Sequence, residues 1–134
     1  MSLGGIVGRT TDPSAKMTGA AVVMGQPLQL GTNYKEVALA TAAAHIPFGV
    51  ASQAAAQNDN VGIWLGGAIV PGLAGAAIVK GVVLTATTAG KFLTAVKTAT
   101  PGTVEFVWGS AYSAAGADLD YFELNFNWFE MDIA

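Results

Sequence analysis

The fold is decided by a ten-residue stretch that occurs twice, as GAAVVMGQPL at residues 19–28 and as GAAIVKGVVL at residues 75–84. Seven of the ten positions are identical or exchange valine for isoleucine, and the two stretches begin 56 residues apart. In each, two β-branched residues precede a glycine within three positions, a pattern typical of a strand that leads into a turn. The repetition predicts two copies of one β-rich unit.

The repeat continues towards the C-terminus. Residues 37–40 match residues 93–96, and residues 48–51 (FGVA) match residues 108–111 (WGSA) at an offset of 60. The second copy is therefore about four residues longer, and we expect the insertion in the Thr/Pro/Gly-rich segment 97–102. Thr32-Asn33 and Thr88-Ala89-Gly90 are typical of hairpin turns between the strands of each unit.

The clearest strand lies near the end of the chain. Phe122, Leu124, Phe126 and Trp128 alternate with polar residues, which predicts one buried and one exposed face. The phase then changes, because Phe129 directly follows Trp128 and the next apolar residues are Met131 and Ile133. Either a β-bulge lies at this point, or the strand leaves its own core and presents Phe129 and Met131 to a partner.

These patterns predict a mainly β protein, a compact β-barrel-like or β-sandwich-like domain made of two tandem repeat units and preceded by an extended arm. The expected organisation is an arm at residues 1–17, a single β domain at 18–134 with units at about 19–67 and 75–128, and a C-terminal strand extension at 129–134. The arm contains Ile6, Val7 and Arg9; it is either a disordered terminus or a segment that becomes ordered on a partner.

Composition favours an assembled protein over a free monomer. Hydrophobic residues make up 52% of the chain and charged residues only 11%, whereas a soluble surface typically carries about 25–35% charged residues. The alternative is a monomer with an uncharged polar surface. Residues 1–104 carry a net charge of +3, whereas residues 105–134 contain six acids and no base. The net charge of −3 does not favour a nucleic-acid partner.

The residues needed for catalysis or metal binding are scarce, so no enzyme, cofactor or metal ion is predicted. The chain has no cysteine and one histidine, His45, which lies among apolar residues and is interpreted as structural. Asp59, Asp118 and Asp120 occupy acidic turns, which Asx turns explain, although an ion at these turns stays open. Residues 61–79 are uncharged and long enough to span a bilayer, but five glycines and Pro71 argue against a membrane helix.

The order of the motifs resembles that of the small β-barrel capsid cement, or decoration, proteins of tailed bacteriophages. The resemblance covers roughly residues 19–128, and Pro27 and Val82 depart from it where that family often has an acid. Neither the arm nor residues 127–134 have a counterpart in the family. The motifs that carry the resemblance are at residues 19–30, 48–67, 75–86 and 108–126.

The resemblance implies a virion protein without catalytic activity on the outer surface of an icosahedral phage head. Such a protein associates as a homotrimer and stabilises contacts between major capsid subunits; neither nucleic acid nor membrane is an expected partner. The segments outside the repeat supply the expected contacts, and these candidate interface residues are Ile6, Val7, Arg9, Trp128, Phe129 and Met131. The alternatives are a tail, fibre or other surface β module, and a ligand-binding barrel or enzyme in which His45, Asp118 and Asp120 converge.

Overall fold

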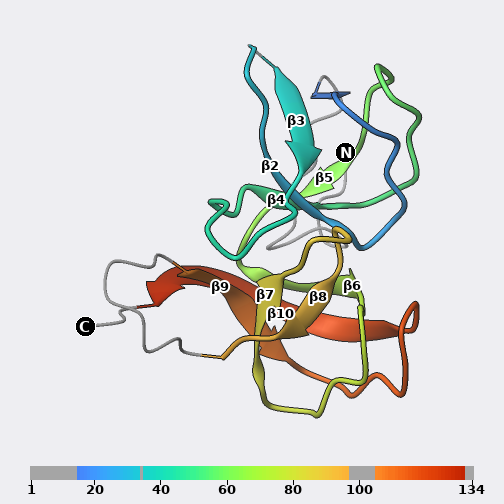
Figure 1. Cartoon of the computed structure of the whole chain (residues 1–134). Coiled ribbons are helices and arrows are strands. Elements are labelled where there is room, and N and C mark those ends of the chain that lie inside the picture. Colours follow the sequence, from blue (N-terminus) through green and yellow to red (C-terminus); the bar gives the residue numbers. More distant parts are fainter. Residues whose placement is uncertain (1–14, 34, 97–104, 132–134) are drawn as a thin grey trace, which may run out of the picture.

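The computed structural model describes residues 15–33, 35–96 and 105–131, and these residues form ten strands without a helix (Figure 1). The prediction of a mainly β fold is confirmed. The strands make two five-stranded sheets, in the orders β1-β3-β2-β4-β5 and β6-β10-β9-β7-β8. No helix long and apolar enough to cross a membrane occurs in the part of the chain that the structure describes.

The first sheet uses the first half of the chain and the second sheet uses the second half. The strands of the first sheet are β1 (Lys16–Met17), β2 (Pro27–Leu30), β3 (Glu36–Leu39), β4 (Gly49–Ala51) and β5 (Ile63–Trp64). The strands of the second sheet are β6 (Ala68–Leu73), β7 (Val83–Ala86), β8 (Phe92–Thr94), β9 (Glu105–Ala111) and β10 (Tyr121–Met131).

Each sheet curls until its two ends meet. In the first, Lys16 of β1 pairs with Asn60, just before β5. In the second, Ala74, just after β6, pairs with Phe92 of β8. Curling of this kind leaves few open backbone edges, which otherwise tend to pair with other chains.

The same pairings occur in both sheets. Val22 and Ala55 exchange two backbone hydrogen bonds of 2.9 and 3.0 Å, and Ile78 and Ala115 do the same at 2.9 and 3.0 Å. Ile78 follows Val22 by 56 residues and Ala115 follows Ala55 by 60, the two offsets of the sequence match. Similar ladders can arise without a duplication, so the tandem repeat stays a prediction.

The hairpin register differs by one residue from the sequence match. Leu30 pairs with Val37 across six intervening residues, whereas Ala86 pairs with Phe92 across five. Val37 therefore corresponds in the structure to Phe92, and not to Leu93 as the alignment of 37–40 with 93–96 predicts. The shorter turn before Phe92 causes the shift, because turn length sets the register of a hairpin.

One local prediction differs from the structure. The β-branched pairs at 22–23 and 78–79 were expected in strands, but only Val22 and Ile78 make single bridges there. Their local propensity is outweighed by the long-range pairing of the residues around them.

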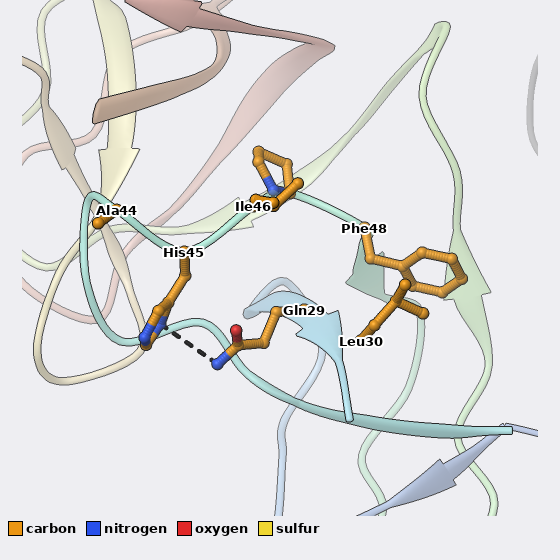
Figure 2. Close-up of a pocket in the computed structure, with 7 residues that line it drawn as sticks. Gln29, Leu30, Ala44, His45, Ile46 and Phe48 are labelled. Carbon is orange, nitrogen blue, oxygen red and sulfur yellow. Dashed lines mark hydrogen bonds between the residues drawn. The ribbon is translucent and has the colours of Figure 1, made fainter. Parts of the chain in front are cut away.

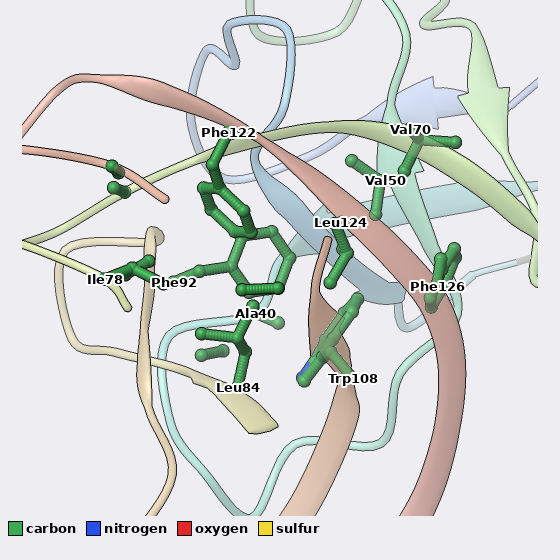
Figure 3. Close-up of a cluster of buried hydrophobic side chains, with 14 residues drawn as sticks. Ala40, Val50, Val70, Ile78, Leu84, Phe92, Trp108, Phe122, Leu124 and Phe126 are labelled. Carbon is green, nitrogen blue, oxygen red and sulfur yellow. The ribbon is translucent and has the colours of Figure 1, made fainter. Parts of the chain in front are cut away.

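The largest hydrophobic cluster lies on the concave side of the second sheet (Figure 3). Trp108 stacks on Phe126 with ring centroids 5.8 Å apart, and Phe92 meets Trp108 and Phe122 edge-on at 5.6 and 6.0 Å. Ala40 and Val50 of the first half belong to the same cluster. The first half therefore contributes to the core of the second sheet, and it also has a buried cluster of its own around Met17, Leu28 and Ile63.

Polar contacts also connect the two sheets. The buried Gln26 side chain accepts the Val23 N–H at 2.8 Å and donates to the Gly90 carbonyl at 2.9 Å. The Leu73 N–H donates to the Gly25 carbonyl at 3.0 Å. Buried hydrogen bonds of this kind are costly to break, so they hold the halves in one arrangement.

The predicted arm is described only at its end. Residues 1–14, with Ile6, Val7 and Arg9, lie outside the described residues. Ala15 and Met17 are buried, and Met17 lies in β1 beside β3. The Val61 N–H donates to the Ala15 carbonyl at 2.9 Å. This bond fixes the point from which the preceding residues extend.

Candidate interaction surfaces

The end of β10 extends beyond the strand that covers its inner half. β6 pairs with β10 only as far as Ala68 opposite Phe126, whereas β9 continues as far as Glu105 opposite Met131. Residues 105–107 of β9 and 127–131 of β10 therefore form a two-stranded projection, here called the ribbon (Figure 1). Within the described residues, no strand lies along its outer side at 127–131.

A β-bulge marks the beginning of the ribbon. Phe126 lies opposite Gly109 and Phe129 opposite Val107, so β10 has one residue more than β9 between these pairs. Gly109 has a φ of +145°, and a Cβ there would overlap the carbonyl oxygen of Asn125. The bulge is observed, and the strand stays paired with β9 beyond it. The presentation of Phe129 and Met131 to a partner stays a prediction.

The bulge changes the environment of the aromatic residues. Phe126 is fully buried, but Trp128 is 44% exposed and Phe129 is 49% exposed. The Trp128 ring meets Phe106 with centroids 5.9 Å apart. Successive residues of a strand point to opposite faces, so each face of the ribbon carries an exposed aromatic ring. The ribbon thus offers two apolar faces and one open backbone edge.

The ribbon is also acidic. Glu130 is exposed on β10, and Glu105 lies opposite Met131 on β9. One carboxylate oxygen of Glu105 is buried and has no hydrogen-bond partner within the described part of the chain. A buried carboxylate oxygen without a donor is unfavourable.

The structure places the predicted site residues unequally. Trp128 and Phe129 lie together on the ribbon, and Met131 is the last residue of β10, with only its strand position described. Ile6, Val7 and Arg9 lie outside the described residues, so their relation to the ribbon is not given by the structure.

A second apolar surface lies on the first sheet and was not predicted. Leu30, Ile46, Pro47 and Phe48 line a cavity of about 360 Å³ (Figure 2). A neighbouring cavity of about 370 Å³ shares Leu30 and Phe48 with it. Leu30 is 66% exposed and Ile46 is 59% exposed. We call the surface formed by these four residues the groove.

The sequence contained a misleading signal at the groove. Leu28, Gln29 and Leu30 alternate, which suggests that both leucines share one buried face. Leu28 is fully buried, whereas Leu30 lies at the end of β2 and is 66% exposed. No sequence pattern indicates the groove, because Leu30 and Ile46 come together only through the fold.

His45 shapes the loop that forms one wall of the groove. Its Nδ1 accepts the Thr41 N–H at 3.0 Å and lies 3.2 Å from Nε2 of Gln29, as Figure 2 shows. The same loop accepts the Phe106 N–H at the Ala43 carbonyl, at 2.8 Å. His45 therefore acts as a hydrogen-bond acceptor that holds the loop against β2.

Replacing His45 with alanine is expected to lower the free energy of unfolding by about 1 kcal/mol, because the Thr41 N–H loses its acceptor. His45→Asn should retain most of the stability, since the asparagine Oδ1 occupies nearly the position of the histidine Nδ1. Urea unfolding of both variants measures the difference. Equal losses in the two variants would show that the ring, and not the acceptor, matters.

The acidic turns contribute no residue to the cavity at His45. The Asp118 carboxylate pairs with the Lys91 ammonium at 2.7 Å. His45 lines its cavity without Asp118 or Asp120. Among the described residues, no three His, Cys, Asp or Glu side chains lie close enough together to hold a metal ion.

No protein-family model matches the chain, and no curated protein matches it. The resemblance to phage cement proteins therefore stays a prediction that rests on the motifs alone. The geometry described above supports binding through apolar surfaces.

Proposed function

We propose that this protein is a decoration protein that binds the outer surface of a phage head and stabilises contacts between major capsid subunits. The motif order resembles that of this class of proteins, and the low proportion of charged residues suits a protein that is covered in an assembly. Its action is adhesion by surface burial.

The observation that carries the proposal is the presence of two apolar surfaces on different sheets, the groove and the ribbon. The groove lies on the first sheet. The ribbon belongs to the second sheet, where β9 and β10 extend together in Figure 1. A decoration protein that forms closed oligomers needs one surface for the capsid and another for its own copies. We assign the groove to the capsid and the ribbon to self-association.

The groove assignment predicts a loss of capsid binding when charges replace its exposed side chains. Leu30→Asp combined with Ile46→Asp should weaken binding about a hundredfold or more, because each change removes apolar burial and places an unpaired charge in the interface. Cosedimentation with heads that lack the protein, assembled from the accompanying major capsid protein, measures the affinity.

Val79→Asp combined with Val96→Asp is a matched control. These valines are 69% and 73% exposed and line neither groove cavity, so this variant should bind heads as the unchanged protein does. Circular dichroism confirms that both variants fold. Normal decoration by the groove variant would remove the groove assignment. If the unchanged protein fails to bind heads but is found in tails or fibres, the decoration proposal itself is wrong.

A further inference from the structure

We propose that the open edge of the ribbon is completed by residues 6–9 of a second copy of this chain, which add a strand beside β10. The inference concerns self-association of the isolated protein, and it does not depend on capsid binding.

The first step is the unpaired backbone at residues 127–131. β9 pairs with one side of β10 here, whereas the pairing of β6 with the other side stops at Ala68, opposite Phe126. Alternate N–H and C=O groups on the other side therefore lack a strand partner among the described residues. An open edge beside exposed aromatic rings readily accepts an extended segment from another chain.

The second step is the match between side-chain patterns. Trp128 and Glu130 share one face of the ribbon, and Phe129 lies on the other. In an extended segment, Val7 and Arg9 would share one face and Ile6 would lie on the other. An added strand at residues 6–9 thus supplies one apolar side chain to each aromatic face, together with a cation near Glu130.

Charge supports the same occupant. Residues 105–134 contain six acids and no base, and Glu130 is exposed on the ribbon. Arg9 is the only base before Lys16. A guanidinium bonded to a carboxylate at such an edge adds specificity to the backbone pairing.

The third step is reach, which favours another copy over the same chain. The Ala15 carbonyl is held by Val61 on the first sheet, and Arg9 is six residues away, so Arg9 reaches at most about 20 Å from it. A domain of this length has a radius of gyration of about 14 Å and so a diameter near 36 Å. In Figure 1, β1 and the end of β10 lie far apart at the extremes of the molecule.

Each copy would then donate one segment and accept another. Such a contact is head-to-tail, and it closes into a ring when the rotation between copies allows it. In a trimeric ring, the edge of every ribbon would be paired with a segment of a neighbouring copy. This agrees with the homotrimer that the family resemblance implies.

Disulfide trapping tests this arrangement cleanly because the chain contains no cysteine. A Val7→Cys protein is mixed with a Trp128→Cys or a Glu130→Cys protein, and the mixture is oxidised mildly. Residues directly opposite each other on paired strands have Cβ atoms about 5 Å apart. We therefore expect a covalent heterodimer with at least one of these partners, seen on a non-reducing gel.

Phe129→Cys is the matched control, because its side chain points to the other face. Its cross-linking with Val7→Cys should be at least tenfold lower, while Ile6→Cys should prefer it. Equal yields with residues 128, 129 and 130 would show that the contact is not an ordered strand. No cross-link with any of them would overturn the proposal. A cross-link within one chain between Val7→Cys and Leu30→Cys would place the segment in the groove instead.

Charge reversal supplies an independent test by sedimentation velocity. Arg9→Glu should weaken self-association about tenfold or more, and adding Glu130→Arg should restore it. Deleting residues 1–13 should give a folded monomer, since Ala15 and Met17 are buried and stay in place. An unchanged oligomer after this deletion would exclude the segment as the occupant, whatever the outcome of capsid binding.

Discussion

Phe92→Ala is expected to lower the free energy of unfolding by about 3–5 kcal/mol, a large part of the stability of a domain of this size. The ring is fully buried and meets both Trp108 and Phe122 edge-on. The Phe92 backbone also pairs with Ala74, where the second sheet curls onto itself. A cavity at this point removes aromatic contacts and loosens the closure of the sheet.

Phe129→Ala is the matched control for this prediction. The chemical change is the same, but Phe129 is 49% exposed and follows the bulge. With both variants made in the protein that lacks residues 1–13, its cost should be below about 1 kcal/mol, since truncation at an exposed site leaves no cavity. Guanidinium unfolding of both variants provides the comparison. Similar losses at the two positions would mean that the aromatic cluster is not the centre of stability.

Gly109→Ala is expected to destabilise the protein by about 3 kcal/mol or more and to displace the ribbon. The residue has a φ of +145°, which L side chains rarely adopt, and an added Cβ would overlap the Asn125 carbonyl oxygen. The obstacle is backbone, which cannot move as a side-chain tip can. The two strands would therefore separate at the bulge.

Gly116→Ala controls for the general effect of adding a methyl group. Its nearest neighbour would be an Asp120 carboxylate oxygen at 3.4 Å, the end of a flexible side chain, and the unfolding free energy should change little. Tryptophan fluorescence reports on this region, because Trp108 directly precedes Gly109 and Trp128 packs beside Phe106. A Gly109→Ala protein with unchanged stability and fluorescence would contradict the proposed need for glycine.

The sequence predicted those features that depend on local alternation. Phe122, Leu124 and Phe126 are buried as their period predicts, and the phase change after them is a bulge. Alternation was sufficient here because β10 is long and is covered on one face. It failed at Leu30, where the pattern is the same but the covering element is missing.

Features that depend on distant partners could not be predicted. The valine pair at 22–23 favours a strand. Whether a second strand pairs with both valines depends on residues near Ala55, 33 positions after Val22. The turn before Phe92 is one residue shorter than the turn before Val37, and this difference changes the register of the hairpin. Such a difference is hard to recognise in an Ala/Gly-rich sequence. The open edge of the ribbon follows from where β6 begins to pair, which no local pattern near Trp128 indicates.

The position of β10 has a consequence for the folding of the protein during its synthesis. β10 lies between β6 and β9 in the second sheet, but it is synthesised after both. Until it emerges, β6 has no described strand beside it along residues 68–72, and the pairing side of β9 is exposed. The first sheet can form early, whereas the second must wait for β10. Nascent chains that stop before Tyr121 should therefore expose unpaired strands and aggregate more than complete ones.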